Sequence, residues 1–173
     1  MLNQNTVSGT LGRNATIGKN SIVDRFTSVG DETFINTNCM ITKATIGNYC
    51  SIGSGVVIGP GEHHLEAISL SGRFYKSAYE ELTSKPCKIS HDVWIGTNAI
   101  IMRDVKVGTG AVIGAGTIVT KDVPDFAVVV GVPARVLKYR FEKTKQNQIL
   151  ESKWFEKDLN EAKIIIKKLE LND

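Results

Sequence analysis

The stretch ISHDVWIGTNAIIMRDVKVGTGAVIGAGTIV, residues 89–119, decides the fold. An aliphatic residue returns in it at every sixth position. The same spacing runs from residue 11 to residue 58, with one step shortened by a residue. The positions are Leu11, Ile17, Val23, Val29, Ile35, Ile41, Ile46, Ile52, Ile58, Ile89, Ile95, Ile101, Val107, Ile113 and Val119. A fixed short period indicates a repeat fold.

The residue two places before each aliphatic position is small or β-branched. These residues are Ala15, Ser21, Thr27, Thr33, Cys39, Ala44, Cys50, Val56, Cys87, Val93, Ala99, Val105, Ala111 and Thr117. Residues two apart share one face of a strand, so each short strand points one large and one small side chain inward. A helix of period 3.6 cannot place every sixth residue on one face.

The residue three places after the aliphatic position is often Asn, Gly or Asp, which turn a chain readily. Examples are Asn14, Asn20, Asn38, Gly55, Gly61, Asn98, Asp104, Gly110, Gly116 and Asp122. Each hexapeptide is therefore a short strand followed by a corner. The sequence predicts an all-β solenoid, a parallel β-helix with three hexapeptides in each coil.

Composition narrows the class of protein. A length of 173 residues suits one domain. The formal charge of +3 comes from basic and acidic residues mixed along the chain, which argues against a nucleic-acid partner. We see no signal-peptide pattern in MLNQNTVSGT and no run of ~20 apolar residues, so we expect a cytoplasmic protein without a membrane span. The cysteines all occupy the small inward position and are predicted to be buried free thiols.

The repeat is interrupted between Ile58 and Ile89 by the segment GPGEHHLEAISLSGRFYKSAYEELTSKP at residues 59–86. We interpret it as an excursion from the coil, at about residues 59–88, within a β-helix domain of residues 1–147. Long loops in compact domains are uncommon and usually functional or disordered. This loop contains two of the three histidines of the chain.

Residues 148–173 have a different pattern, with apolar residues three and four apart and Lys and Glu between them. This spacing predicts an amphipathic helix. We expect it to cap the open end or the flank of the coil, or to pack on a neighbouring subunit. A helix lying on a membrane surface is the alternative.

The hexapeptides Ile46-Gly47-Asn48 and Ile52-Gly53-Ser54 resemble those of the hexapeptide-repeat acyltransferases, and this resemblance implies a left-handed β-helix. Similar stretches are GEH at residues 61–63, DVWIG at 92–96, VTKDVP at 119–124, GVPAR at 131–135 and YRF at 139–141. The branch that is most similar acetylates antibiotics and surface polysaccharides. Three positions depart from the family pattern. His64 replaces a proline, Arg103-Asp104 replaces proline-glycine, and Val132 replaces an asparagine.

The resemblance implies direct transfer of acetyl from acetyl-CoA to a hydroxyl or amine, with His63 as the general base. An imidazole with a pKa near ~6.5 suits this role at neutral pH. His64 is the alternative base, because a shift of one residue in the loop alignment would exchange the two. We interpret His91 as a solvated or acceptor-side residue. These three histidines lack a metal-binding spacing, and we predict no metal site.

For coenzyme A the resemblance points to a set of residues along the coil, and for the acceptor we propose residues of the loop itself. The glycines and alanine would let pantetheine approach the backbone, and the basic residues would meet phosphates. The coenzyme residues are Trp94, Gly96, Gly114, Ala115, Thr120, Lys121, Arg135 and Lys138. The acceptor candidates are His64, Ser69, Phe74, Tyr75 and Tyr79. The basic residues can equally be solvated, and Trp94 can simply pack at the edge of the coil.

The first functional hypothesis is an acetyl-CoA-dependent O- or N-acetyltransferase acting on a sugar of a surface polysaccharide or on a nucleotide-sugar. The resemblance also implies a homotrimer with active sites between subunits. The alternatives are an antibiotic O-acetyltransferase of the streptogramin or chloramphenicol type, and a non-catalytic β-helical scaffold subunit. The identity of the acceptor and the choice between oxygen and nitrogen stay open.

Overall fold

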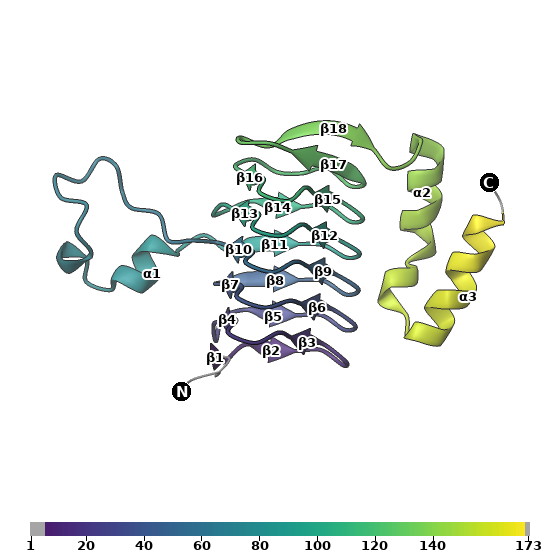
Figure 1. The fold of residues 1–173 in the computed structure, drawn as a ribbon, viewed down its shortest axis with the longest axis horizontal. Helices are drawn as coiled ribbons and strands as arrows, with labels where there is room; N and C mark the ends of the chain where they lie inside the picture. Colours follow the sequence, from purple (N-terminus) through teal and green to yellow (C-terminus); the bar gives the residue numbers. More distant parts are fainter. Residues whose placement is uncertain (1–5, 172–173) are drawn as a thin grey trace.

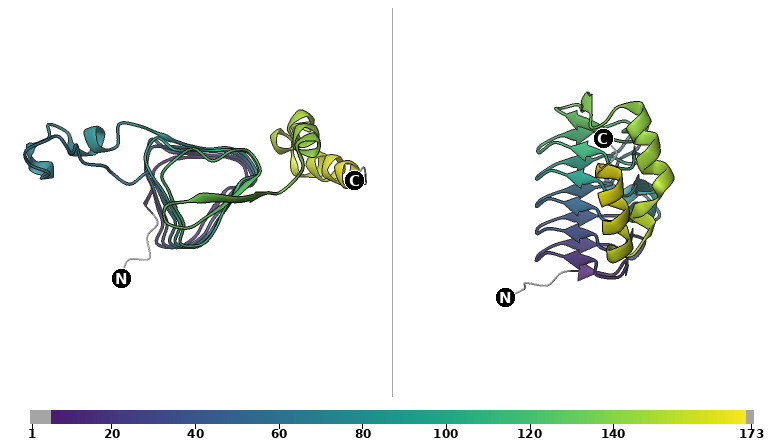
Figure 2. Two further views of the ribbon diagram at one scale, coloured as in Figure 1. Left: turned by 90° about the horizontal axis from the view of Figure 1, so that it is seen from above. Right: turned by 90° about the vertical axis from the view of Figure 1, so that its right-hand side faces the viewer.

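The computed structural model describes residues 6–171 and is a triangular prism of stacked coils (Figures 1 and 2). A long loop leaves the prism at one corner, and two helices lie beside another corner. Each coil contributes short strands to three parallel sheets that form the sides of the prism. The predicted left-handed parallel β-helix with a protruding loop and a helical C-terminal region is confirmed.

We name the three sheets after their first strands. The β1 sheet contains β1 (Thr6–Val7), β4 (Ile22–Val23), β7 (Met40–Ile41), β10 (Val57–Ile58), β13 (Ile100–Ile101) and β16 (Ile118–Val119). The β2 sheet contains β2 (Thr10–Leu11), β5 (Ser28–Val29), β8 (Ala44–Ile46), β11 (Cys87–Ile89) and β14 (Lys106–Val107). The β3 sheet contains β3 (Thr16–Ile17), β6 (Phe34–Ile35), β9 (Ser51–Ile52), β12 (Trp94–Ile95), β15 (Val112–Ile113), β17 (Ala127–Val130) and β18 (Arg135–Tyr139).

The aliphatic residue of each hexapeptide points into the prism and stacks on its equivalents in the coils above and below. In the β3 sheet, for example, Ile95 pairs with Ile52 and Ile113, and all three side chains are buried. Full burial of such a side chain contributes ~1.5–3 kcal/mol. Cys39, Cys50 and Cys87 fill small inward positions as buried free thiols, as predicted. Burial raises the pKa of the Cys50 thiol to about 12.

Most of the predicted corner residues have the left-handed backbone conformation that turns the chain. Positive φ angles occur at Asn14, Asn20, Asn38, Gly55, Asn98, Asp104, Gly110 and Gly116. Gly61 and Asp122 do not have it, since Gly61 lies in the excursion and the Asp122 carboxylate instead accepts a bond from the Lys106 N–H at 2.8 Å. The shortened hexapeptide is explained by a tight corner at Lys43, where φ is 45°.

The C-terminal region contains two helices rather than the single helix predicted from residue 148. Helix α2 is Lys143–Ser152 and helix α3 is Leu159–Glu170, with a 3-10 turn at Trp154–Glu156 between them. Lys153 turns the chain with a φ of 47°. Asp158 then caps α3, because its carboxylate accepts bonds from the N–H groups of Asn160 and Glu161.

This helical hairpin covers the flank of the prism at the corner between the β2 and β3 sheets (Figure 2). The His91 ring stacks on Phe155 with centroids 4.8 Å apart, and the Asn48 amide donates to the Phe155 carbonyl at 3.0 Å. The Tyr49 hydroxyl donates to the Lys157 carbonyl at 2.8 Å. Of the expected positions, the structure selects the flank, while β17 and β18 cover the C-terminal end of the coil.

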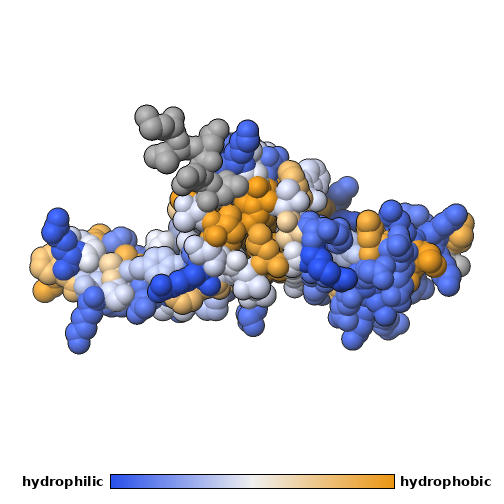
Figure 3. Space-filling view, turned by 90° about the horizontal axis from the view of Figure 1, so that it is seen from below, coloured by the Kyte–Doolittle hydropathy of each residue, from blue (hydrophilic) through white to orange (hydrophobic). Residues whose placement is uncertain are grey.

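The N-terminal end of the coil presents an apolar surface (Figure 3). Here the first described coil has inward residues with no coil beneath them among residues 6–171, and Leu11 is 41% exposed. Val7 and Ile17 are partly buried against the core. Within the same range, no helix is long and apolar enough to cross a membrane.

Candidate active site

The excursion leaves the coil at the end of β10 and returns at the start of β11, at the corner between the β1 and β2 sheets (Figure 1). It contains a 3-10 turn at Gly72–Phe74 and helix α1 (Ala78–Leu82). Its outer part exposes large apolar side chains to an unusual degree. These are Leu65 at 82%, Ile68 at 108%, Leu70 at 53% and Phe74 at 78% exposure.

His63 lies where the two arms of the excursion come together. The N–H of Glu62 donates to the carbonyl of Leu82 at 2.9 Å, which joins the outgoing arm to the end of α1. A pocket of about 180 Å³ forms beside this bond. It is lined by Glu62, His63, His64, Glu81, Leu82, Ser84, Lys85 and Arg103. Both imidazoles are accessible, so either can meet a substrate that enters the pocket.

Tyr75 lies beside both histidines. Its hydroxyl accepts a bond from the His64 N–H at 3.2 Å. Its ring centroid is 6.0 Å from that of His63 and 5.4 Å from that of His64, both with edge-to-face geometry. His64 and Tyr75 are therefore the predicted acceptor residues that the structure brings to His63.

The other predicted acceptor residues lie elsewhere in the excursion. The Ser69 hydroxyl accepts a bond from the Ser71 N–H at 3.2 Å, and the Phe74 side chain points to solvent. Tyr79 donates its hydroxyl to Asp24, and its ring stacks 6.2 Å from that of Phe26 on the coil. Burial and this bond raise the pKa of Tyr79 to about 12. Within one chain, Tyr79 anchors the excursion to the coil.

Trp94 and Lys138, two predicted coenzyme residues, meet on the outer surface of the β3 sheet. They line a pocket of about 650 Å³ together with Ser51, Asp92, Val112, Val128 and Arg140. The Trp94 side chain is 58% exposed, so it is available for stacking. Asp92 and Arg140 were not among the predicted coenzyme residues, although both lie in stretches that carried the resemblance.

Arg140 and Asp92 form the polar wall of this pocket. Their side chains make an ion pair at 3.2 Å, and Arg140 also donates to the Gly110 carbonyl at 2.7 Å. Burial raises the pKa of Asp92, and the Arg140 charge opposes this shift. The hydrogen bonds fix the guanidinium against the coil, next to the exposed face of Trp94.

Gly96, Gly114 and Ala115 lie at the corner between the β3 and β1 sheets, where successive coils touch. A Cβ atom on Gly96 would lie 2.5 Å from the Ala115 backbone nitrogen and 2.9 Å from the Gly114 carbonyl carbon. Glycine at 96 is therefore required for stacking of the coils, whatever binds there. Ala115 is exposed at the same corner and is open to a ligand.

The remaining predicted coenzyme residues are dispersed. Thr120 and Lys121 follow β16 and are exposed at the corner between the β1 and β2 sheets. Arg135 begins β18, pairs with Val130 and donates to the Ala134 carbonyl at 2.8 Å. One chain therefore distributes the predicted coenzyme residues over different sides of the prism and does not gather them into one pocket.

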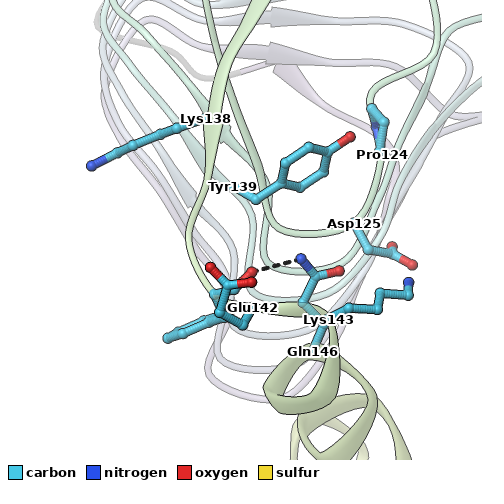
Figure 4. Close-up of a pocket in the computed structure, with 8 residues that line it drawn as sticks. Pro124, Asp125, Lys138, Tyr139, Glu142, Lys143 and Gln146 are labelled. Carbon is cyan, nitrogen blue, oxygen red and sulfur yellow. Dashed lines mark hydrogen bonds between the residues drawn. The ribbon is translucent and has the colours of Figure 1, made fainter.

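A larger cavity of about 790 Å³ lies at the C-terminal end of the coil, between β18 and α2 (Figure 4). It is lined by Pro124, Asp125, Lys138, Tyr139, Phe141, Glu142, Lys143 and Gln146. The Gln146 amide donates to the Phe141 carbonyl at 2.8 Å and fixes the start of α2. Tyr139 points toward Pro124, whereas Lys138 extends away from it.

His91 has a structural environment rather than the solvated or acceptor-side one that we expected. Its Nδ1 accepts a bond from the Asn48 N–H at 3.0 Å, and its ring is stacked on Phe155. Burial lowers its pKa, and the charge of Glu156 opposes the shift. Among the described residues, no group of three or more His, Cys, Asp or Glu is placed to hold a metal ion.

Comparison with known proteins gives matches over the coil. The family profile described as bacterial transferase hexapeptide (six repeats) matches residues 26–60 and 86–121. A chloramphenicol acetyltransferase of Agrobacterium fabrum is 40% identical over 124 residues, which cover 65% of this chain and 59% of the relative. A probable macrolide acetyltransferase of Lysinibacillus sphaericus is 32% identical, with 65% of this chain and 69% of the relative covered.

Solved structures agree with the sequence matches. A hexapeptide-repeat acetyltransferase of Vibrio cholerae, complexed with acetyl coenzyme A, superposes with a TM-score of 0.67 at 30% identity. The superposition covers 79% of this chain and 73% of that one. A galactoside acetyltransferase in complex with coenzyme A gives a TM-score of 0.64 at 29% identity, covering 78% and 70%. The chain spans 59% to 64% of the chloramphenicol acetyltransferases that it matches. Together with the coil geometry, these matches show that the chain belongs to the hexapeptide-repeat acyltransferase family.

Proposed function

We propose that this protein is an acetyl-CoA-dependent acetyltransferase whose acceptor is a hydroxyl or amine of a sugar. The observation that carries the proposal is the pocket at the neck of the excursion, which is the place where its two arms come together. There His63 is accessible beside His64 and Tyr75. A rigid scaffold with a protruding loop is a common way to present catalytic groups. The family of the chain and its solved neighbours supply the donor.

In the proposed reaction His63 removes the proton of the acceptor as its oxygen or nitrogen attacks the thioester carbonyl. The carbon–sulfur bond then breaks, the acceptor keeps the acetyl group, and the protonated imidazole returns its proton to the leaving thiolate. Backbone N–H groups at a coil corner stabilise the negative charge on the carbonyl oxygen. No covalent intermediate on the protein is needed, because both substrates bind together.

For the coenzyme we propose Trp94 and the exposed corner at Gly96, Gly114 and Ala115 as the surface along which pantetheine lies. Lys138 and Arg135 at the C-terminal end would meet the phosphates, since both are exposed. Thr120 and Lys121 would approach the coenzyme from a different subunit. We assign the two groups of coenzyme residues to different subunits because one chain places them on different sides of the prism.

The active site then requires a second copy of the chain, and we propose a homotrimer. After Thr6 in the first strand, the outward residues of the β1 sheet are apolar in successive coils, namely Ile22, Met40, Val57, Ile100 and Ile118. The equivalent residues of the β2 sheet are Thr10, Ser28, Thr45, Lys88 and Lys106. An extended apolar face together with the exposed apolar residues of the excursion favours contact with another copy.

The acceptor has a second candidate class. The 40% identity to a chloramphenicol acetyltransferase favours an antibiotic acceptor, whereas solved galactoside and maltose O-acetyltransferases favour a sugar. The replacement of the expected proline by His64 changes the loop next to the base. We place the sugar first, because the galactoside and maltose O-acetyltransferase structures superpose on 78% and 79% of this chain. A non-catalytic scaffold is the remaining alternative.

Calorimetric titration with coenzyme A is the first test, followed by release of free thiol from acetyl-CoA with maltose, a galactoside, a nucleotide-sugar or chloramphenicol. Coenzyme binding and turnover with a sugar would support the proposal. Turnover with chloramphenicol alone would select the antibiotic enzyme. Absence of coenzyme binding would favour the third hypothesis, a non-catalytic β-helical scaffold subunit. The His63→Ala protein serves as the control, since it should bind coenzyme A normally and fail in turnover.

A further inference from the structure

Arg103 lies directly under the neck of the excursion. It follows β13 on the coil, and only 6% of the residue is exposed. Its Nε donates to the Pro60 carbonyl at 3.1 Å, and its Nη1 donates to the Lys85 carbonyl at 3.1 Å. Its Nη2 donates to the Gly59 carbonyl and to the Thr42 hydroxyl. One guanidinium therefore occupies four acceptors around the base of the loop.

Three of these acceptors belong to the two arms of the excursion, and the fourth, the Thr42 hydroxyl, lies on the coil. Gly59 and Pro60 begin the outgoing arm, and Lys85 ends the returning arm. The planar guanidinium, with donors in a fixed fork, can join both arms to the coil at once, whereas a lysine ammonium cannot match that geometry. All four bonds go to uncharged oxygens, so Arg103 acts here through geometry rather than through pairing with a carboxylate.

The backbone leaves room for this contact at Gly59. Its φ is +68°, and an added Cβ would lie 2.8 Å from the Arg103 guanidinium carbon and 2.7 Å from the Thr42 carbonyl. The Thr42 hydroxyl also donates to the Gly59 carbonyl, which fixes the same peptide from the coil. Glycine, threonine and arginine thus form one connected joint at the exit of the loop.

The joint formed by Gly59, Thr42 and Arg103 lies close to His63, the proposed general base. His63 is three residues beyond Pro60, Glu62 between them is bonded to Leu82, and Arg103 itself lines the pocket that holds His63. We propose that Arg103 is a positioning residue. Its hydrogen bonds join the two arms of the excursion and thereby hold His63 in the position that catalysis requires. This inference rests on the proposed function, in which His63 is the general base.

The test compares Arg103→Ala with Arg13→Met, which removes an exposed arginine of the first coils. Amide exchange of residues 59–66 is measured by mass spectrometry, and kcat and KM for acetyl-CoA are measured with the best acceptor among maltose, a galactoside and chloramphenicol. For Arg103→Ala we expect exchange at Glu62 to be at least ~10-fold faster and kcat to fall ~10- to 100-fold, since small misplacements of catalytic groups are costly. The KM for acetyl-CoA should be unchanged, and millimolar guanidinium should restore part of kcat.

A folded Arg103→Ala protein with wild-type exchange at Glu62 and wild-type kcat would overturn the inference. If Arg103→Ala does not fold, Thr42→Val removes one acceptor of the same joint, and faster exchange at Glu62 again supports the inference, while unchanged exchange refutes it. If the wild-type protein transfers no acetyl group, the proposed function fails. The exchange measurement then still decides whether Arg103 holds the loop.

Discussion

The coil and the excursion of this protein are held in opposite ways. In the coil, a strand such as β12 bonds to the strands above and below it, and its inward side chain is buried between theirs. The excursion leaves large apolar residues exposed and is held to the coil by a small number of side-chain contacts, among them the Arg103 joint, the contact of Tyr79 with Asp24 and the bond from Lys43 to the Glu80 carbonyl. The conformation of the coil is fixed by many equivalent strand pairings and buried side chains, whereas that of the loop depends on a few individual contacts. Substitutions of buried side chains in the coil should therefore change the stability of the whole protein. Substitutions in the loop, or at its anchors on the coil, should change the order of the loop or its function.

The largest expected effect is on catalysis, in a variant of the loop. His63→Ala should lower kcat by ~10²–10⁴-fold, because the proton of the acceptor loses its base. Coenzyme A affinity and the melting temperature should stay near those of the wild type. Steady-state kinetics and calorimetry check this, with His64→Ala as the matched variant. A large loss of kcat in His64→Ala with normal turnover in His63→Ala would exchange their roles.

The next effect is on stability, in a variant of the coil. Ile95→Ala removes a fully buried side chain between two coils and should lower the free energy of unfolding by ~2–5 kcal/mol. Ile164→Ala, at a position of α3 that is 58% exposed, should change it by less than ~0.5 kcal/mol. Urea unfolding of both proteins measures the difference. Equal values would contradict the assignment of the coil interior as the source of stability.

A smaller effect is expected at the anchor of the excursion. Tyr79→Phe removes the hydroxyl that donates to Asp24, and a hydrogen bond contributes ~0.5–1.5 kcal/mol. Limited proteolysis should cut the excursion several-fold faster, while the urea midpoint of the whole protein stays unchanged. Tyr139→Phe, on β18, is the control and should be cut at the wild-type rate. If the two variants are cut equally, Tyr79 does not hold the loop.

The smallest effect is the response of the coil flank to pH. Burial lowers the pKa of His91 below its ordinary value of about 6.5, so below that pH the unfolded chain binds a proton more readily than the folded one. Stability contributed by the neutral ring is present above pH ~6.5 and is lost as the pH falls. Urea unfolding between pH 7.5 and 5.5 measures this slope. His91→Asn keeps an acceptor for the Asn48 N–H and should flatten it; an unchanged slope would exclude His91 as its source.

The hexapeptide spacing predicted the fold because burial in a coil repeats at every sixth residue. Corners with Asn, Gly or Asp were equally readable, but those at Glu32, Tyr49 and Phe126 also have positive φ and were missed. Their side chains lie at or near the corner that the helical hairpin flanks, so tertiary contacts compensate for the backbone conformation. The break between α2 and α3 was also missed, because Lys153 has a positive φ although it is not Asn, Gly or Asp. Asp158, which caps α3, is an ordinary capping residue.

The site was less predictable than the fold. The motif around His63 was recognisable, and His64 and Tyr75 lie beside it, but Tyr79 packs on the coil instead. Arg103 entered the sequence analysis only as a departure from the family pattern. Its four partners are up to 61 residues away in the chain, and the sequence offers no local signal that joins them.

The sequence by itself determined the stacked coils and the position of the excursion that contains His63 and His64, because both depend on local spacing and side-chain type. The tertiary structure alone decided which groups meet. It placed Arg103 between the two arms of the loop, paired Arg140 with Asp92 beside Trp94, and dispersed the coenzyme candidates over the prism. The physical reason is that coil stacking brings together residues distant in sequence, and their contacts follow from the closed shape of the prism.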